Sequence, residues 1–161
     1  MEKLSLMNTI TEEELASHAV WVATNGSEGT RMEKTGSNLS GASLAGLKAP
    51  KAHFIGTTLS GADLSGAELP EIDCSGATFT GADLSNANLR GADLSGVTLD
   101  EVDFTGADLS GADMSGATLI NANLTNAKLR GADLIAANLT GTKRDGADLT
   151  DAILSDTMGL E

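Results

Sequence analysis

The sequence has few of the residues that usually build a globular core, a crosslink or a catalytic site. Its 161 residues include one tryptophan, three phenylalanines and no tyrosine, although aromatic side chains normally supply much of a globular core. Cys74 is the single cysteine, so an internal disulfide is excluded. No phosphate-binding loop, His–Glu metal signature or nucleophile close to a histidine is present. We therefore expect a protein that is not an enzyme and that uses neither a metal nor a cofactor.

Long hydrophobic runs and basic residues are also scarce. No stretch is long enough to span a membrane, and residues 1–7 lack the charged start and apolar run of a secretory signal. We expect a cytoplasmic location and no membrane association. Ten Lys and Arg residues stand against 23 Asp and Glu residues, a net charge of −13, so we expect no direct binding to nucleic acid.

What the sequence does contain is a repeat of five residues, close to Ala-Asp-Leu-Ser-Gly, without a gap from Phe79 to Leu139. With the leucine taken as position i, 17 of the 24 positions between Leu39 and Leu154 are leucine, and 17 of the 24 residues at i−2 are alanine. Self-similarity at a fixed period is typical of repeat architectures. Residues i−2 and i point the same way along an extended segment, and Gly or Asn at i+2 suits a corner, because both tolerate positive φ.

A chain that turns the same way every five residues closes on itself and rises. The pattern therefore predicts a solenoid with leucine and alanine inside and polar residues outside. Cys74 falls at an inward position, where we expect it to be buried filler. The predicted core is represented by Phe79, Leu84, Leu89, Leu94, Leu99 and Phe104.

The repeat closely resembles the pentapeptide-repeat family, whose consensus is A(D/N)LXX, from Ser37 to Asp156. The resemblance implies an all-β solenoid: a right-handed quadrilateral β-helix with four units in each coil, and hence about six coils. We accordingly divide the chain into an N-terminal segment (residues 1–36), a repeat β-helix (37–156) and a C-terminal tail (157–161).

One helix is expected, over about residues 11–24. Thr11 and Glu14 have the spacing of a capping box, which satisfies free N–H groups at a helix start, and Asn25 followed by Gly26 is a natural stop. The first coil of a solenoid exposes an apolar cross-section and unpaired backbone edges. We expect the helix to cover it with Leu15, His18, Trp21 and Val22.

Two alternatives for this helix stay open: it docks a partner, or His18 belongs to an enzyme site. The segment from His18 to Trp21, followed by Gly26, Gly29 and Arg31, is also similar to a leader that precedes the repeats in some members of the family.

Two positions break the inward pattern, because Ala49 and Arg144 stand where leucine belongs. Pro50 follows Ala49, and Pro70 has the same place one coil later. Proline cannot donate to a backbone ladder, so we expect this side to be distorted or to form an exposed bulge. A buried unpaired arginine is very costly. We therefore expect the side that carries Arg144 to open, or its side chain to escape past the end.

Negative charge is concentrated in the middle of the repeats. Between Ala52 and Ala127 there are eleven carboxylates and one basic residue, Arg90. A coil of twenty residues stacks the aspartates at i−1 into two acidic columns and the threonines into a neutral one. The first acidic column contains Asp73, Asp93, Asp113 and Asp133, the second contains Asp63, Asp83 and Asp103, and the neutral column contains Thr58, Thr78, Thr98 and Thr118. Two interpretations stay open: the aspartates only keep the rod soluble, or they form a surface for a basic partner.

The sequence thus predicts a non-catalytic protein-interaction or scaffold protein with an unidentified, basic protein partner. The alternative function is that of a DNA mimic that binds DNA gyrase or another nucleic-acid-binding protein, as the resemblance implies from family members that protect gyrase from quinolones. Those members carry a C-terminal dimerisation module, and some have projecting loops; this sequence has neither. We expect a monomer or a weak end-to-end dimer.

Overall fold

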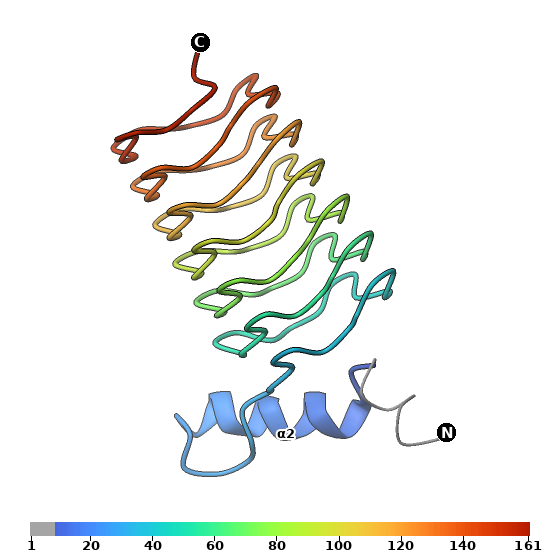
Figure 1. Cartoon of the computed structure of the whole chain (residues 1–161). Helices are drawn as coiled ribbons and strands as arrows, with labels where there is room; N and C mark the ends of the chain where they lie inside the picture. The colour runs from blue at the N-terminus through green and yellow to red at the C-terminus, as the bar shows by residue number, and fades with distance from the viewer. Residues whose placement is uncertain (1–8) are drawn as a thin grey trace.

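The computed structural model describes residues 9–161 and shows a solenoid with a helix at its N-terminal end (Figure 1). Parallel bridges join residues twenty positions apart, from Glu33 with His53 to Asn138 with Met158. Four five-residue units therefore make one coil. Residues 1–8 of the predicted N-terminal segment lie outside the described residues.

Each side of a coil contributes one bridged residue to the ladder, so the solenoid consists of short extended segments separated by corners. The N–H of an inward residue donates to a carbonyl of the following coil, as from Leu39 to Thr58 and from Leu94 to Asp113, both at 2.7 Å. The N–H of residue i−1 donates to the preceding coil, as from Thr58 to Ser37 at 2.9 Å. These bonds stack the coils at the ordinary interstrand spacing of about 4.8 Å.

Every corner places residue i+2 at positive φ, the conformation that the glycines there adopt without a steric penalty. Several corners use other residues, including Lys51 (φ 60°), Glu71 (56°) and Ala136 (56°). A side chain in this region costs roughly 1–2 kcal/mol. The ladder bonds on both sides of the corner hold these residues in place.

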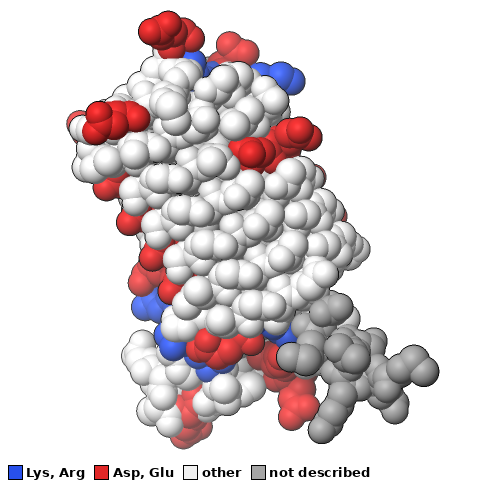
Figure 2. Space-filling view, viewed as in Figure 1, with Lys and Arg blue, Asp and Glu red and all other residues white. Residues whose placement is uncertain are grey.

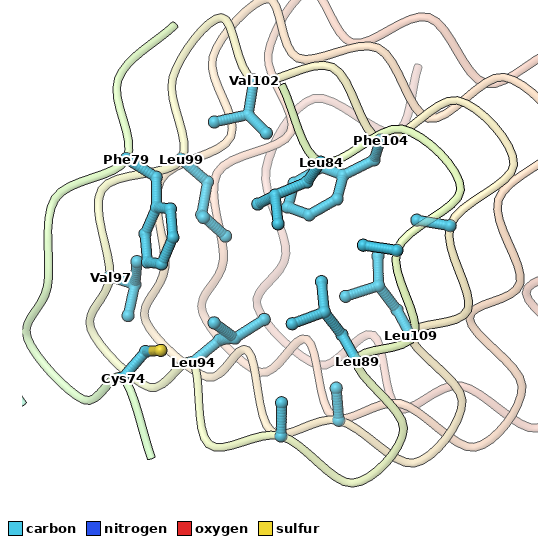
Figure 3. Packing of buried hydrophobic residues seen from close by; sticks show 14 of the residues in the cluster. Cys74, Phe79, Leu84, Leu89, Leu94, Val97, Leu99, Val102, Phe104 and Leu109 are labelled. Atoms are coloured by element: carbon cyan, nitrogen blue, oxygen red, sulfur yellow. The ribbon is translucent and has the colours of Figure 1, made fainter. Parts of the chain in front are cut away.

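The core consists of the inward columns at i and i−2. Phe79, Leu84, Leu89, Leu94, Leu99 and Phe104 are each at most 2% exposed, and their side chains point into the interior (Figure 3). Cys74 lies in the same columns and is fully buried. Stacked leucine, with alanine beside it, fills the narrow interior with few aromatic rings.

The expectation of a distorted side at Pro50 is wrong. The ladder passes through it unbroken: the N–H of Ala49 donates to Glu68 at 3.0 Å and that of Lys51 to Pro70 at 2.9 Å. Pro50 occupies i+1, the one position of the unit whose N–H makes no backbone hydrogen bond. The missing proline donor therefore costs the ladder nothing here.

The ladder extends slightly beyond both predicted bounds of the repeat, 37 and 156. It begins at Glu33, because Met32 and Lys34 already occupy inward positions and are buried. At the other end Met158 still pairs with Asn138. Arg144 lies half-buried in the last coil, which no further coil covers within the described residues.

Helix α2 spans Glu12–Ala23 and lies across the N-terminal end of the solenoid (Figure 1). Its capping box is complete, since the N–H of Glu14 donates to the Thr11 hydroxyl at 3.1 Å and the N–H of Thr11 donates to the Glu14 carboxylate at 2.8 Å. Ile10 and Leu15 pack against the solenoid core. Within residues 9–161 no helix has the length and apolarity that crossing a membrane requires.

Candidate functional site

The two acidic columns are continuous in the folded chain. Bridges join Asp73 to Asp93, Asp93 to Asp113 and Asp113 to Asp133, so four carboxylates follow one another along one face. The second column runs through Asp63, Asp83 and Asp103 and continues into Asn123. The twenty-residue register thus places seven carboxylates in two rows along the solenoid.

Each of these aspartates also stabilises the corner that follows it. In the first column, Asp93 accepts through Oδ1 from the N–H of Ser95 at 3.0 Å and from its hydroxyl at 2.6 Å. In the second, Asp103 accepts the same pair of bonds from Thr105 at 2.9 and 2.6 Å. The serine or threonine at i+1 is therefore part of the site, a role that the repeat pattern does not indicate, because it shows only that this position faces outward and is polar.

The second carboxylate oxygen remains available. Among the described residues, Oδ2 of the seven column aspartates makes no hydrogen bond, whereas Oδ1 of each is held by the corner. The hydroxyl and N–H of Ser65 lower the pKa of Asp63, the column member for which such a shift is resolved. The columns therefore present oriented negative charge at a regular spacing.

The other two faces of the solenoid carry no continuous column of aspartates among the described residues. On one of them opposite charges pair: Lys48 with Glu68 at 2.9 Å, Arg90 with Asp108 at 3.4 Å, and Arg130 with Asp148 at 3.3 Å. The other carries the uncharged column Thr58, Thr78, Thr98 and Thr118. Figure 2 shows a broad face with few charged side chains and a row of acidic groups along its edge. The two acidic columns are therefore the faces on which aspartates follow one another at the bridged position in successive coils.

The helical cap is attached through His18, which is 1% exposed. The N–H of Met32 donates to its Nδ1 at 3.0 Å. Nε2 therefore carries the proton and donates to the carbonyl of Pro50 at 2.9 Å. Both ring nitrogens are occupied by backbone groups, so the alternative in which His18 serves as a catalytic base is not supported by this geometry.

Trp21 covers the exposed side of this attachment. Its ring stacks on His18 with 5.7 Å between centroids and 13° between planes. The guanidinium of Arg31 lies over the Trp21 ring, 5.5 Å from its centroid, a distance that suits a cation–π interaction. Leu15, Trp21 and Val22, the other predicted cap residues, are each half-buried.

An ion pair between a buried lysine and a half-buried glutamate joins the cap to the first coil. Lys34 occupies an inward position, is 4% exposed, and donates from Nζ to both oxygens of Glu14 at 2.7 and 2.8 Å and to the carbonyl of Thr9 at 2.6 Å. Desolvation raises the pKa of Glu14, but the bonds from Lys34 and Thr11 outweigh it, and the pKa is lowered overall. A lysine is tolerated in a leucine column because the cap supplies its partners.

Other chemistry is sparse in the part of the chain that the structure describes. Residues 9–161 contain no group of three or more His, Cys, Asp or Glu side chains arranged to hold a metal ion. Cys74 is fully buried; desolvation, followed by the charges of Asp73 and Asp93, raises the pKa of its thiol far above the ordinary value. The two acidic columns and the helical cap are therefore the candidate surfaces among the described residues.

Two cyanobacterial pentapeptide-repeat proteins have similar structures. HetL, a protein involved in heterocyst differentiation regulation from Nostoc sp. strain PCC 7120, is 26% identical, with 81% of this chain and 86% of HetL covered and a TM-score of 0.52. Rfr23 from Cyanothece 51142 is 24% identical, with 89% of this chain and 98% of Rfr23 covered and a TM-score of 0.59.

A third structure, a trypsin-treated form of QnrB1, is of a plasmid-mediated fluoroquinolone resistance protein. It is 24% identical over 78% of this chain and 72% of its own, with a TM-score of 0.41. No curated protein matches the chain significantly. Pentapeptide repeats, in eight copies, match residues 37–73, 59–96, 82–119, 99–134 and 117–156. Because these matches cover most of the chain and agree with the observed fold, the protein belongs to the pentapeptide-repeat family.

Proposed function

We propose that this protein is a non-catalytic interaction module that binds a basic protein partner along its acidic columns. The observation that carries the proposal is the arrangement of the column aspartates: one oxygen of each is fixed by the corner, and the other is free of hydrogen bonds within residues 9–161. A surface whose charges are already ordered loses little side-chain entropy on binding.

The distribution of charge supports a directional surface. Solubility alone needs negative charge but does not need it in rows on two faces while a third face pairs its charges. Complementary charge steers a basic partner and speeds association, and the effect weakens with salt because exposed charges are screened beyond about 8 Å at physiological ionic strength. The similar protein HetL is involved in regulation, which is consistent with a binding role.

The narrower alternative, mimicry of DNA toward gyrase, has no specific observation in its favour. One column repeats a carboxylate at about 4.8 Å, whereas duplex DNA carries one charge per roughly 1.7 Å of axis. The second column lies on a different face and does not close this gap. We therefore retain the more general proposal of a basic protein partner in the cytoplasm.

The experiment compares two variants with equal charge. The column variant carries Asp73→Asn, Asp93→Asn, Asp113→Asn and Asp133→Asn. The control variant removes four exposed carboxylates elsewhere, by Glu28→Gln, Glu101→Gln, Asp156→Asn and Glu161→Gln. Each protein is immobilised and exposed to an extract of the source organism, and the retained proteins are identified at low and raised salt.

We expect wild type and the control variant to retain a basic protein at low salt and to release it at raised salt. The column variant should retain at least tenfold less of that protein. Retention by the column variant equal to that of the control would overturn the assignment of this column.

A further inference from the structure

The attachment of α2 depends on one protonation state of one side chain. Nδ1 of His18 must be unprotonated to accept the N–H of Met32, while Nε2–H donates to Pro50. A proton on Nδ1 would bring two donors face to face at 3.0 Å inside a site that excludes water. We propose that His18 is a pH-sensitive latch, and that its protonation releases α2 from the first coil of the solenoid.

The surroundings of the ring disfavour its charged form. Arg31, on the connector between α2 and the solenoid, lies over the ring of Trp21, which in turn stacks on His18. The carbonyl of Pro50 is the ring's one acceptor, and it is already satisfied by the neutral tautomer. Most other charged groups near this junction already have a partner of opposite charge. These pairs are Glu14 with Lys34, Glu33 with Arg31 and His53, Lys48 with Glu68, and Lys51 with Glu71. Glu12 and Glu13 are exposed on the first turn of α2.

The direction of the switch follows from these contacts. Burial, with a further contribution from Arg31, lowers the pKa of His18 below its ordinary 6.5, although the bond to Pro50 opposes this change. The released helix therefore binds the proton more tightly than the docked one. Docking is fully favoured above pH 6.5, weakens as the pH falls below 6.5, and is weakest below the lowered pKa of the docked state.

Release changes what the end of the solenoid presents. Ile10 and Leu15 leave the core against which they pack, and Pro50 and Met32 lose their side-chain partner. The first coil then offers an open backbone edge, the feature that favours association between chains. The latch thus couples acidification to exposure of a surface distinct from the acidic columns.

Trp21 is the single tryptophan and stacks on His18, so its fluorescence reports docking directly. Between pH 7.5 and 5, the emission of wild type should shift to longer wavelength and its quenching by acrylamide should increase, while the circular dichroism of the solenoid stays constant. His53 is the only other histidine, so His53→Gln is the matched control and should retain the transition.

His18→Gln should abolish the transition, because an amide does not titrate in this range. If this variant docks, its spectrum resembles that of wild type at pH 7.5; if it does not, it resembles wild type at pH 5. The proposal is overturned if wild type shows no change, if His18→Gln retains the transition, or if His53→Gln loses it. NMR titration of the His18 ring supplies an independent check, since a pKa at or above 6.5 in the docked state would also refute the latch.

Discussion

At the residue scale, each column aspartate serves two separate physical roles. Oδ1 of Asp93 accepts from the N–H and hydroxyl of Ser95, while Oδ2 makes no hydrogen bond within residues 9–161 and leaves the negative charge of this half-buried side chain without a partner. Asparagine has only the first ability, and the chain uses it that way at Asn138, which accepts the same two bonds from Thr140. Stability and charge at this position are therefore separable by substitution.

The comparison of Asp93→Asn with Asp93→Ala tests this separation. Both variants remove the same charge, but only alanine removes the two corner bonds, which should cost about 1–3 kcal/mol. We expect Asp93→Asn to stay within about 0.5 kcal/mol of wild type in urea unfolding. Equal stability of the two variants would contradict a role for the aspartate in the corner.

At the element scale, the fit of α2 depends on a glycine in the connector. Gly29 has φ +74°, and a Cβ there would overlap the carbonyl oxygen of Ser17 and lie 2.7 Å from the N–H nitrogen of Trp21. The backbone of the connector therefore packs directly on the backbone of the helix. Only a residue without a side chain permits this approach.

Gly29→Ala should displace the helix and destabilise the cap by about 1–3 kcal/mol. Gly36→Ala is the matched control, because Gly36 has a similar φ of +65° but nothing within 4 Å of the added carbon. Trp21 emission reports displacement of α2 and thermal unfolding reports stability, so the two measurements together distinguish Gly29→Ala from Gly36→Ala. A control that shifts Trp21 emission as much as Gly29→Ala would show that backbone strain, rather than overlap with α2, is responsible.

The ion pair of the cap is acid-sensitive at lower pH than the His18 latch, so it is tested in the His18→Gln background, where no titration of His18 releases α2 before Glu14 is protonated. The pKa of Glu14 is lowered from its ordinary 4.5, so the pair contributes stability above pH 4.5 and loses it as the pH falls through the lowered value. We expect Glu14→Gln to remove this dependence below pH 4.5. The variant should also weaken the cap at neutral pH, because it leaves the Lys34 ammonium buried without its partner. Thermal unfolding of the His18→Gln protein with and without Glu14→Gln, at pH 7 and pH 3.5, checks both effects. Equal losses of stability between these two pH values in the two proteins would contradict the assignment.

The cap also shows where prediction from the sequence ends. The capping box involves residues three positions apart, Thr11 and Glu14, and its spacing alone identifies it. The partners of His18 and Lys34 lie 14 to 32 positions away in the chain. No local pattern specifies such pairings. The helix pattern placed His18 on the covering face, but nothing in the sequence indicated its hydrogen-bond partners or the burial of Lys34. The column register, by contrast, follows from the repeat, because every unit has the same length.

At the scale of the whole molecule, the interior of the solenoid is closed along its length, and Cys74 is a natural reporter of its opening. The thiol is fully buried, and its pKa is raised mainly by desolvation, so the reactive thiolate is suppressed in the folded protein. We expect a thiol reagent to modify Cys74 at a rate set by unfolding, many-fold slower than in denaturant. Modification of the folded protein at the rate of the denatured chain would show that the coils around Cys74 open independently.

The twenty-residue register makes the pattern of the core independent of the pattern of the surface. The core repeats every five residues, whereas a surface column repeats every twenty. Loss of one whole coil, such as residues 81–100, would stack Asp113 on Asp73 and leave all faces intact. Loss of a single unit, such as residues 81–85, would keep leucine over leucine but place Thr98 over Asp73. Duplication or loss of single units in the gene would thus change which side chains lie together on a face while the fold persists. We therefore expect the surface of this protein to diverge faster in evolution than its solenoid.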